Sequence, residues 1–155
     1  LEDTNECIDP ITEAFLLYAS RKHLDQNILR KNLDNGFGVI ADRYADATLA
    51  YQCYGKGLST DFIDYIHEES KLLTPDLTFY MDISAKKSKE RISHREMDRM
   101  ESESLEFFEK VRQGYLEIAV KSPGRVVCLD AKKSIEELKT EILNKTLEKI
   151  NAAME

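Results

Sequence analysis

The sequence predicts an α/β fold, in which a parallel sheet is wrapped by helices to give three layers. Three short apolar runs, VIAD at 39–42, TFYMD at 78–82 and VVCLD at 126–130, each end in aspartate. Segments with helical periodicity separate them, and this alternation is typical of parallel sheets. At 155 residues the chain has the length of one domain with a sizeable core, so we expect a single domain over residues 1–155.

The first helix has clear start and stop signals. Asp9 is a typical capping residue, and Pro10 suits the first helical position. Asn35-Gly36 is a typical helix end, so we expect a helix over about 11–33. By periodicity its inward stripe comprises Leu17, Leu24 and Ile28.

Arg21 falls on this stripe, between Leu17 and Leu24, where a cation is unusual. One interpretation is an arginine at the edge of the core whose head group reaches solvent. The other is an arginine that points at a ligand, and both remain open.

The rest of the chain alternates between short elements. The patterns predict a strand over 37–41, helices over 46–53 and 60–72, a strand over 77–81, helices over 84–95 and about 105–121, a strand over 125–129 and a final helix. Ser134 and Glu137 form a capping box for the final helix. Its inward residues should be Leu138, Ile142 and Ile150.

Gly55-Lys56-Gly57 looks like part of a phosphate-binding loop but has the wrong spacing. The pattern G-x-x-x-x-G-K-[ST] requires glycine at position 50 and serine or threonine at position 57. This chain has Ala50 and Gly57 there, so we interpret the segment as a turn.

Composition and charge exclude several classes of protein. The net charge of −7 gives no general attraction for nucleic acid, so no such partner is expected. No apolar run approaches the roughly 18 residues of a membrane span, so no membrane partner is expected either. Cys7, Cys53 and Cys128 are scattered and lie at no metal-binding spacing from a histidine, which favours reduced thiols in a cytoplasmic protein.

Asp42 and Arg43 stand out among the residues at the strand ends. An acid and an arginine at the carboxyl end of a parallel strand lie where ligands bind in open α/β sheets. The guanidinium can bind two phosphate oxygens, and the carboxylate can hold a lysine or a magnesium-bound water. For Asp82 and Asp130, capping of the following turn is the simpler explanation.

The segment 91–103 is densely charged and includes Arg91, Arg95 and Arg99. Such a run is usually a solvated face. It also suits a mobile lid that brings positive charge onto a phosphoryl group in transfer, because that chemistry depends mainly on positioning and charge.

Together these blocks resemble the thymidylate kinases (dTMP kinases) of the P-loop nucleoside monophosphate kinase superfamily. The matching blocks, in order, are DPITEAFLLYASRKHL at 9–24, VIADRYADATLAYQCYGKGL at 39–58, PDLTFYMD at 75–82, REMDRME at 95–101 with FFEKVRQGYL at 107–116, and VVCLDA at 126–131. The block at 39–58 is the specific one. The resemblance implies a P-loop kinase fold and a homodimer that moves the γ-phosphoryl of ATP, with Mg²⁺, onto dTMP.

The resemblance also implies roles for single residues. Arg43 would hold the dTMP phosphate, with Asp42 beside the phosphate and the metal. Arg21 would lie beside the thymine base. The other implied residues are Thr48 and Gln52 at the base edge, Tyr51 against the deoxyribose, Arg95 and Arg99 as lid arginines, Glu101 near the metal, and Ala131, Lys132 and Ser134 in the loop beside adenine.

This chain departs from the family pattern beside the base. Family members usually carry an aromatic residue four positions before the base-side arginine, whereas this chain has Leu17 there and Tyr18 next to it. Apolar contact from Leu17 and stacking by Tyr18 both remain open. The lid also lacks a glycine after Arg95 and is one residue shorter than the common pattern.

Family members begin with a strand and the phosphate loop, followed by a second strand, and the resemblance places all three outside this sequence. We therefore expect roughly 45 further residues in front of Leu1 and a sheet without its first two strands. Alone, this chain is expected to fold poorly and to be inactive. Two alternatives stay open: a kinase for another nucleoside monophosphate or a deoxynucleoside, and a non-catalytic nucleotide-binding domain without a phosphate loop.

Overall fold

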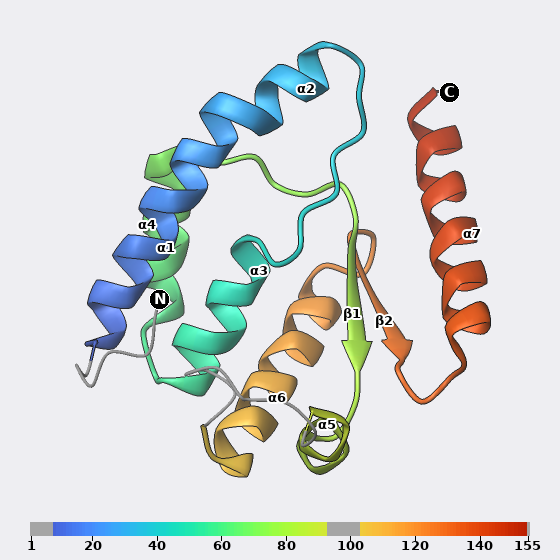
Figure 1. Cartoon of the computed structure of the whole chain (residues 1–155). Helices are drawn as coiled ribbons and strands as arrows, with labels where there is room; N and C mark the ends of the chain where they lie inside the picture. Colours follow the sequence, from blue (N-terminus) through green and yellow to red (C-terminus); the bar gives the residue numbers. More distant parts are fainter. Residues whose placement is uncertain (1–7, 93–102, 155) are drawn as a thin grey trace.

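Helices and strands alternate from β1 (Thr78–Asp82) onward as the sequence predicts, whereas only helices and loops precede β1 in the described residues. The computed structural model describes residues 8–92 and 103–154 (Figure 1). Its elements are α1 (Pro10–Leu24), η1 (Asp25–Leu29), α2 (Arg30–Asp34), α3 (Ala45–Thr48), η2 (Leu49–Gly55), α4 (Thr60–Ser70), β1 (Thr78–Asp82), α5 (Ala85–Ile92), α6 (Leu105–Lys121), β2 (Val126–Asp130) and α7 (Ile135–Met154), where η denotes π-helix. None of the helices in these residues is long and apolar enough to cross a membrane.

Segments α1, η1 and α2 form one continuous helix, as the sequence predicts. The Asp9 carboxylate caps it by accepting hydrogen bonds from the backbone N–H groups of Ile11 and Thr12, at 2.7 and 3.3 Å. The π-helical turn at η1 takes more residues than an α turn and shifts the inward face. Leu29 is therefore buried and Ile28 is 50% exposed, so the inward position expected for Ile28 is wrong.

The strand expected over 37–41 is also wrong. The segment forms no strand and runs as a loop from α2 to α3 (Figure 1), and the Ile40 side chain is fully exposed. A strand needs a neighbour for its N–H and C=O groups, and no strand in the described residues pairs with this segment.

Strands β1 and β2 form a parallel pair. Thr78 lies opposite Val126 and Asp82 opposite Asp130, so both carboxyl ends meet at the same edge. Figure 1 shows α6 and α7 on opposite sides of this pair. The parallel, helix-flanked arrangement expected from the sequence is confirmed for these two strands.

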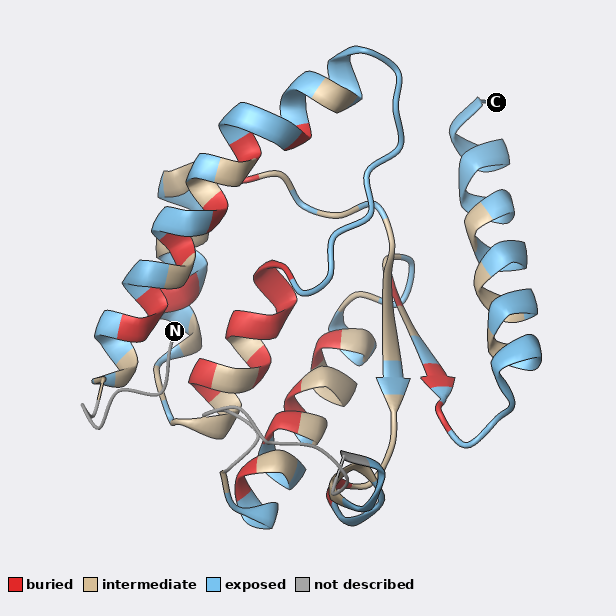
Figure 2. Cartoon of the chain, viewed as in Figure 1, coloured by how far each residue is buried: buried red, intermediate tan, exposed pale blue. Residues whose placement is uncertain are grey.

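The helix formed by α3 and η2 lies at the centre of the molecule and is largely buried (Figure 2). Cys53 packs on one side in a cluster with Ala14, Tyr18, Ile63 and Leu72 from α1, α4 and the residues that follow α4. Ala50 packs on the other side in a cluster with Phe107, Val111, Ile118 and Val126 from α6 and β2. Small buried residues, among them Ala47, Ala50 and Cys53, allow other helices to pack against this helix on both sides. This close packing holds the backbone of the helix in place.

The segment Gly55-Lys56-Gly57 is a turn, as the spacing argument predicts. It ends η2, and Gly57 has a φ of 80°, which suits glycine. It therefore connects η2 to α4.

Glycines also let α6 approach η2 closely. A Cβ atom on Gly114 would lie 2.7 Å from the ring of Tyr54, and one on Gly55 would lie 2.5 Å from the ring of Phe107. We expect Gly114→Ala to lower the free energy of unfolding by about 1–3 kcal/mol, because the added methyl group overpacks this contact. Chemical denaturation measures the loss.

Gly124→Ala is the matched control, since a Cβ there meets nothing within 4 Å. We expect it to change the free energy of unfolding by less than about 0.5 kcal/mol. Equal effects of the two substitutions would show that the contact with Tyr54 adapts freely.

Helix α7 begins at the expected capping box. Glu137 N–H donates to Ser134 Oγ at 3.3 Å, and Ser134 N–H donates to Glu137 Oε2 at 2.8 Å. Leu138 and Ile142 are half-buried as expected. Ile150 is 50% exposed, so its expected inward position is wrong, because residues 147–154 of α7 are all exposed.

Candidate functional site

A pocket of about 190 Å³ opens beside β1 and contains two of the expected site residues, Arg43 and Tyr51. Strand β1, helix α5 and helix α6 supply the rest of its lining, which includes Tyr80, Met81, Ser88, Lys89, Phe108, Arg112 and Tyr115. The pocket therefore lies toward the carboxyl end of β1, an edge where ligands bind in open α/β sheets.

Arg43 adopts an unusual backbone conformation at this pocket. Its φ is 60°, in the left-handed region that a non-glycine residue rarely occupies. Its guanidinium lies 5.0 Å from the ring centroid of Tyr51 and donates a hydrogen bond to the Tyr51 hydroxyl at 3.2 Å. Left-handed residues of this kind are frequent at functional sites, because the surrounding structure must hold them there. The neighbouring Asp42 is exposed.

Two stacked tyrosines form the aromatic wall of the pocket. The rings of Tyr80 and Tyr115 are parallel within 10° with centroids 4.4 Å apart, and Tyr51 contacts Tyr115 edge-on at 6.4 Å. Burial raises the pKa of Tyr115 well above its ordinary value, while the positive charges of Arg43 and Arg21 act in the opposite direction. Tyr115 therefore stays protonated and lies within the field of both arginines.

Four further residues of the pocket lining are not predicted as site residues by the sequence: Tyr80, Lys89, Arg112 and Tyr115. The missed signal is the period-two pattern of β1, whose polar residues fall on one face. Thr78 donates a hydrogen bond to Asp46 at 2.9 Å, Tyr80 stacks on Tyr115, and Asp82 binds Arg112. A strand with a polar face that is covered by helices indicates partners on those helices.

The capping role expected for Asp82 is wrong, because Arg112 takes both of its oxygens, at 2.7 and 3.1 Å. For Asp130 the expectation is confirmed, since its Oδ1 accepts a hydrogen bond from the backbone N–H of Lys132 at 3.0 Å. The two aspartates share one edge of the sheet, but only Asp82 has an arginine from α6 within reach.

The pair with Arg112 should make stability depend on pH. Its hydrogen bonds lower the pKa of Asp82 below the ordinary 3.8, against a smaller opposing effect of burial. The contribution is complete at neutral pH and is lost as the pH falls below about 4. We expect Arg112→Ala to destabilise the protein by about 1 kcal/mol at pH 7 and by less at pH 3, as measured by urea denaturation.

Lys139→Ala, which removes an exposed partner of Glu136 on α7, is the control and should behave like the unmodified protein at both pH values. An equal loss for Arg112→Ala at pH 7 and pH 3 would contradict the role of the Asp82 carboxylate.

The expected base-side residues lie in a buried contact between α1 and the central helix. Arg21 donates a hydrogen bond to Thr48 Oγ1 and is only 9% exposed. Burial lowers the pKa of Arg21, and nearby tyrosines act in the opposite direction. The head group therefore does not reach solvent, so the solvent-facing interpretation is wrong. The ligand-facing interpretation stays a prediction.

The position of Tyr18 bears on the two alternatives beside the base. Tyr18 is 4% exposed and packs in the cluster with Ile63, and its hydroxyl donates to the Ile63 carbonyl at 3.5 Å. Leu17 is half-buried and lies one helical turn before Arg21. Tyr18 is therefore part of the core that α1 forms with α4, whereas Leu17 lies on the same face of α1 as Arg21.

The loop after β2 carries the residues expected beside adenine. Ala131 is buried, its N–H donates to the Asp82 carbonyl at 3.0 Å, and its carbonyl accepts from Arg91 at 2.9 Å. Lys132 is exposed, and Ser134 caps α7. Arg95, Arg99 and Glu101, together with most of the expected lid at 91–103, lie outside the described residues.

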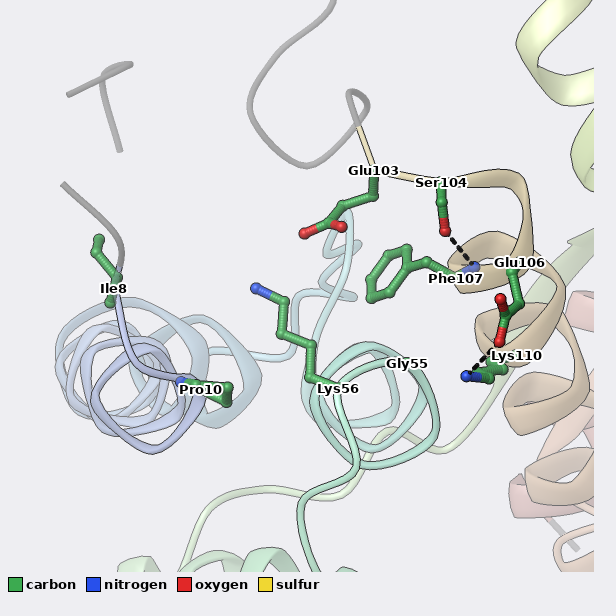
Figure 3. A pocket seen from close by; sticks show the side chains of 9 residues that line it. All are labelled: Ile8, Pro10, Gly55, Lys56, Glu103, Ser104, Glu106, Phe107 and Lys110. Carbon is green, nitrogen blue, oxygen red and sulfur yellow. Dashed lines mark hydrogen bonds and ion pairs between the residues drawn. The ribbon is translucent and has the colours of Figure 1, made fainter. Parts of the chain in front are cut away.

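A larger pocket, of about 530 Å³, contains none of the expected site residues (Figure 3). It lies between the start of α1, the end of η2 and the start of α6, and Phe107 and Lys56 extend into it. The Lys56 ammonium is paired with the buried Glu13 at 2.8 Å. This pocket shares no lining residue with the tyrosine-lined one.

Comparison with known proteins assigns the chain to a family. The family model described as thymidylate kinase matches residues 1–142. The chain belongs to the thymidylate kinase family. The thymidylate kinase of Chlorobaculum tepidum is 37% identical, and the match covers 93% of this chain and 72% of the relative. That of Chlorobium luteolum is 39% identical and is matched over 95% of this chain and 73% of its own length.

A solved thymidylate kinase also shares the fold. The crystal structure of the Ehrlichia chaffeensis enzyme superposes with a TM-score of 0.68 at 27% identity, covering 85% of this chain and 60% of that one. Membership of the thymidylate kinase family confirms the expected α/β fold of the P-loop kinase type and the expected phosphotransferase class. The relatives support dTMP as the acceptor and do not favour the alternatives. The chain spans about three fifths of the solved thymidylate kinase and under three quarters of these two relatives.

Proposed function

We propose that the intact protein transfers the γ-phosphoryl group of ATP to dTMP, giving dTDP and ADP, and that the described residues supply the acceptor side. The observation that carries the proposal is Arg43, a guanidinium at the mouth of the tyrosine-lined pocket. No carboxylate in residues 8–92 and 103–154 forms an ion pair with it, so it is available for an anionic ligand. Family membership supports the phosphate of dTMP as that ligand.

In this proposal Arg43 binds the dTMP phosphate, and Tyr51 packs against the deoxyribose. An oxygen of that phosphate attacks the γ-phosphorus of ATP, and the bond between the γ-phosphorus and ADP breaks. Positive charge neutralises the oxygens in transfer, from Arg43 and from the lid arginines Arg95 and Arg99. Arg21 and Thr48 bind the base edge with Gln52, and Leu17 makes apolar contact with the ring.

Mg²⁺ fits Asp42 as a single protein ligand. Asp42 is exposed beside Arg43, and residues 8–92 and 103–154 contain no group of three metal-binding side chains. One or two carboxylates are typical where the substrate phosphates and water complete the magnesium shell. When bound, Mg²⁺ would neutralise phosphate charge; Glu101 is a second candidate, and Ala131, Lys132 and Ser134 are proposed to line the adenine subsite.

We further propose a cytoplasmic homodimer that assembles through α1. Ile11, Phe15 and Leu16 are 44–53% exposed on this helix, which Figure 2 shows with exposed residues along its outer face. A patch of this kind is typical of an interface between chains. Phe15→Glu should shift the dimer toward monomer in analytical ultracentrifugation.

Thermal stabilisation by nucleotides tests the acceptor. A ligand at 100 times its Kd raises the free energy of unfolding by about 2.7 kcal/mol, so dTMP should raise the melting temperature of the intact protein by several degrees. We expect smaller shifts from dCMP, dGMP and thymidine at the same concentration. A larger shift from any of these three would overturn dTMP as the substrate.

A further inference from the structure

A row of polar side chains joins α1 to the central helix within the core. At one end Arg21 binds Thr48, and two turns away Glu13 binds Gln52 and Lys56. Glu13 is 1% exposed and Gln52 is 2% exposed. Buried polar groups need defined partners, so each contact in this row restricts the geometry of the next.

Glu13 determines which way the Gln52 amide faces. Gln52 Nε2 lies 3.1 Å from Glu13 Oε2, and Lys56 Nζ lies 2.8 Å from the same oxygen. A carboxylate only accepts hydrogen bonds, so the amide must present its NH₂ group to Glu13. Lys56 holds the carboxylate oxygen in place from the other side.

The opposite atom of the amide, Gln52 Oε1, is buried without a hydrogen-bond partner in the described residues. A buried acceptor without a partner is unfavourable, and a ligand that donates a hydrogen bond relieves this. Thr48, one turn before Gln52 on the central helix, binds Arg21, whose guanidinium offers N–H donors. A donor beside an acceptor is the complement of an imide edge, which presents a carbonyl next to a ring N–H.

We propose that Glu13 is a positioning residue for base selection, which holds Gln52 so that it presents an acceptor to the ring N–H of thymine. The inference rests on the proposed function. Cytosine has an unprotonated ring nitrogen and an amino group on this edge, so it opposes both the fixed Gln52 oxygen and the Arg21 donors. Without Glu13 the amide can turn over, and discrimination against cytosine falls.

The test is Glu13→Gln in the intact protein, which keeps the shape of the side chain but can both donate and accept. We measure kcat and KM for dTMP and dCMP at saturating ATP. The KM for dTMP should rise about tenfold with kcat within about twofold, because binding of the base is uniform along the reaction. The ratio of kcat/KM for dTMP to that for dCMP should fall about tenfold.

A purely structural role would lower the melting temperature and leave that ratio unchanged, which would overturn the inference. Glu117→Gln is the matched control, because Glu117 accepts a hydrogen bond from Tyr54 of η2 at 2.9 Å on the side facing α6. It should leave the ratio unchanged, and a fall equal to that of E13Q would also overturn the inference.

Lys56→Gln provides the test if E13Q does not fold, because it loosens the Glu13 carboxylate without removing it. The ratio should again fall, by less than for E13Q, and an unchanged ratio would overturn the inference. Failure of the proposed function looks different: the unmodified protein would then not prefer dTMP over dCMP, and both proposals would fall together.

Discussion

Replacing Arg43 with glycine should lower kcat/KM for dTMP by about 10²–10³-fold while leaving the fold intact. The loss corresponds to about 3–4 kcal/mol, as expected when a phosphate loses a charge-assisted arginine contact. Stability should stay within about 1 kcal/mol, because glycine relieves the left-handed backbone at φ 60° but removes the contact with the Tyr51 ring. Steady-state kinetics and urea denaturation measure the two effects separately.

Lys71→Gly is the matched control for the backbone. Lys71 also has a positive φ, 49°, and ends α4 away from the tyrosine-lined pocket. It should raise the free energy of unfolding by up to about 1 kcal/mol and leave kcat/KM unchanged. If Arg43→Gly retained more than a tenth of the activity, the role of Arg43 at the phosphate would be wrong.

Replacing Asp46 with alanine should lower the free energy of unfolding by about 3–5 kcal/mol. Asp46 is 6% exposed, and its two oxygens accept hydrogen bonds from the Arg125 guanidinium, both at 2.7 Å. Thr78 donates to it as well, so one carboxylate ties the central helix to β1 and to the residue that precedes β2. Its removal leaves Arg125, whose side chain is only 22% exposed, without an anionic partner. Denaturation of the intact protein measures the loss.

Two comparisons check this interpretation. Glu148→Ala breaks an exposed ion pair with Lys145, whose distance is also 2.7 Å. It should lower the free energy of unfolding by less than about 1 kcal/mol. The double substitution of Asp46 and Arg125 by alanine should be less damaging than the sum of the single ones, because the charges are coupled. A loss below 1 kcal/mol for Asp46→Ala would show that the pair is not a structural tie.

The family was recognisable from the sequence because its specific block, 39–58, is contiguous. Acceptor residues on one short segment, Arg43, Thr48, Tyr51 and Gln52, keep their spacing wherever the segment lies. Their roles stay predictions, although the structure brings Arg43 and Tyr51 to one pocket. Tyr80 and Arg112 were missed because they come from separate elements and meet only across the pocket.

Local chemistry determined the parts of this protein that the sequence predicts by itself. The caps at Asp9 and Ser134 and the turn at Gly55-Lys56-Gly57 depend on neighbouring residues. The parallel direction of β1 and β2 follows from the helices that separate them in the sequence. Tertiary structure alone decided the rest, because a pairing partner far along the chain carries no local signal. In the described residues, 37–41 has no strand to pair with. Asp82 binds Arg112 of α6 instead of capping a turn, and Glu13 is buried in contact with Gln52.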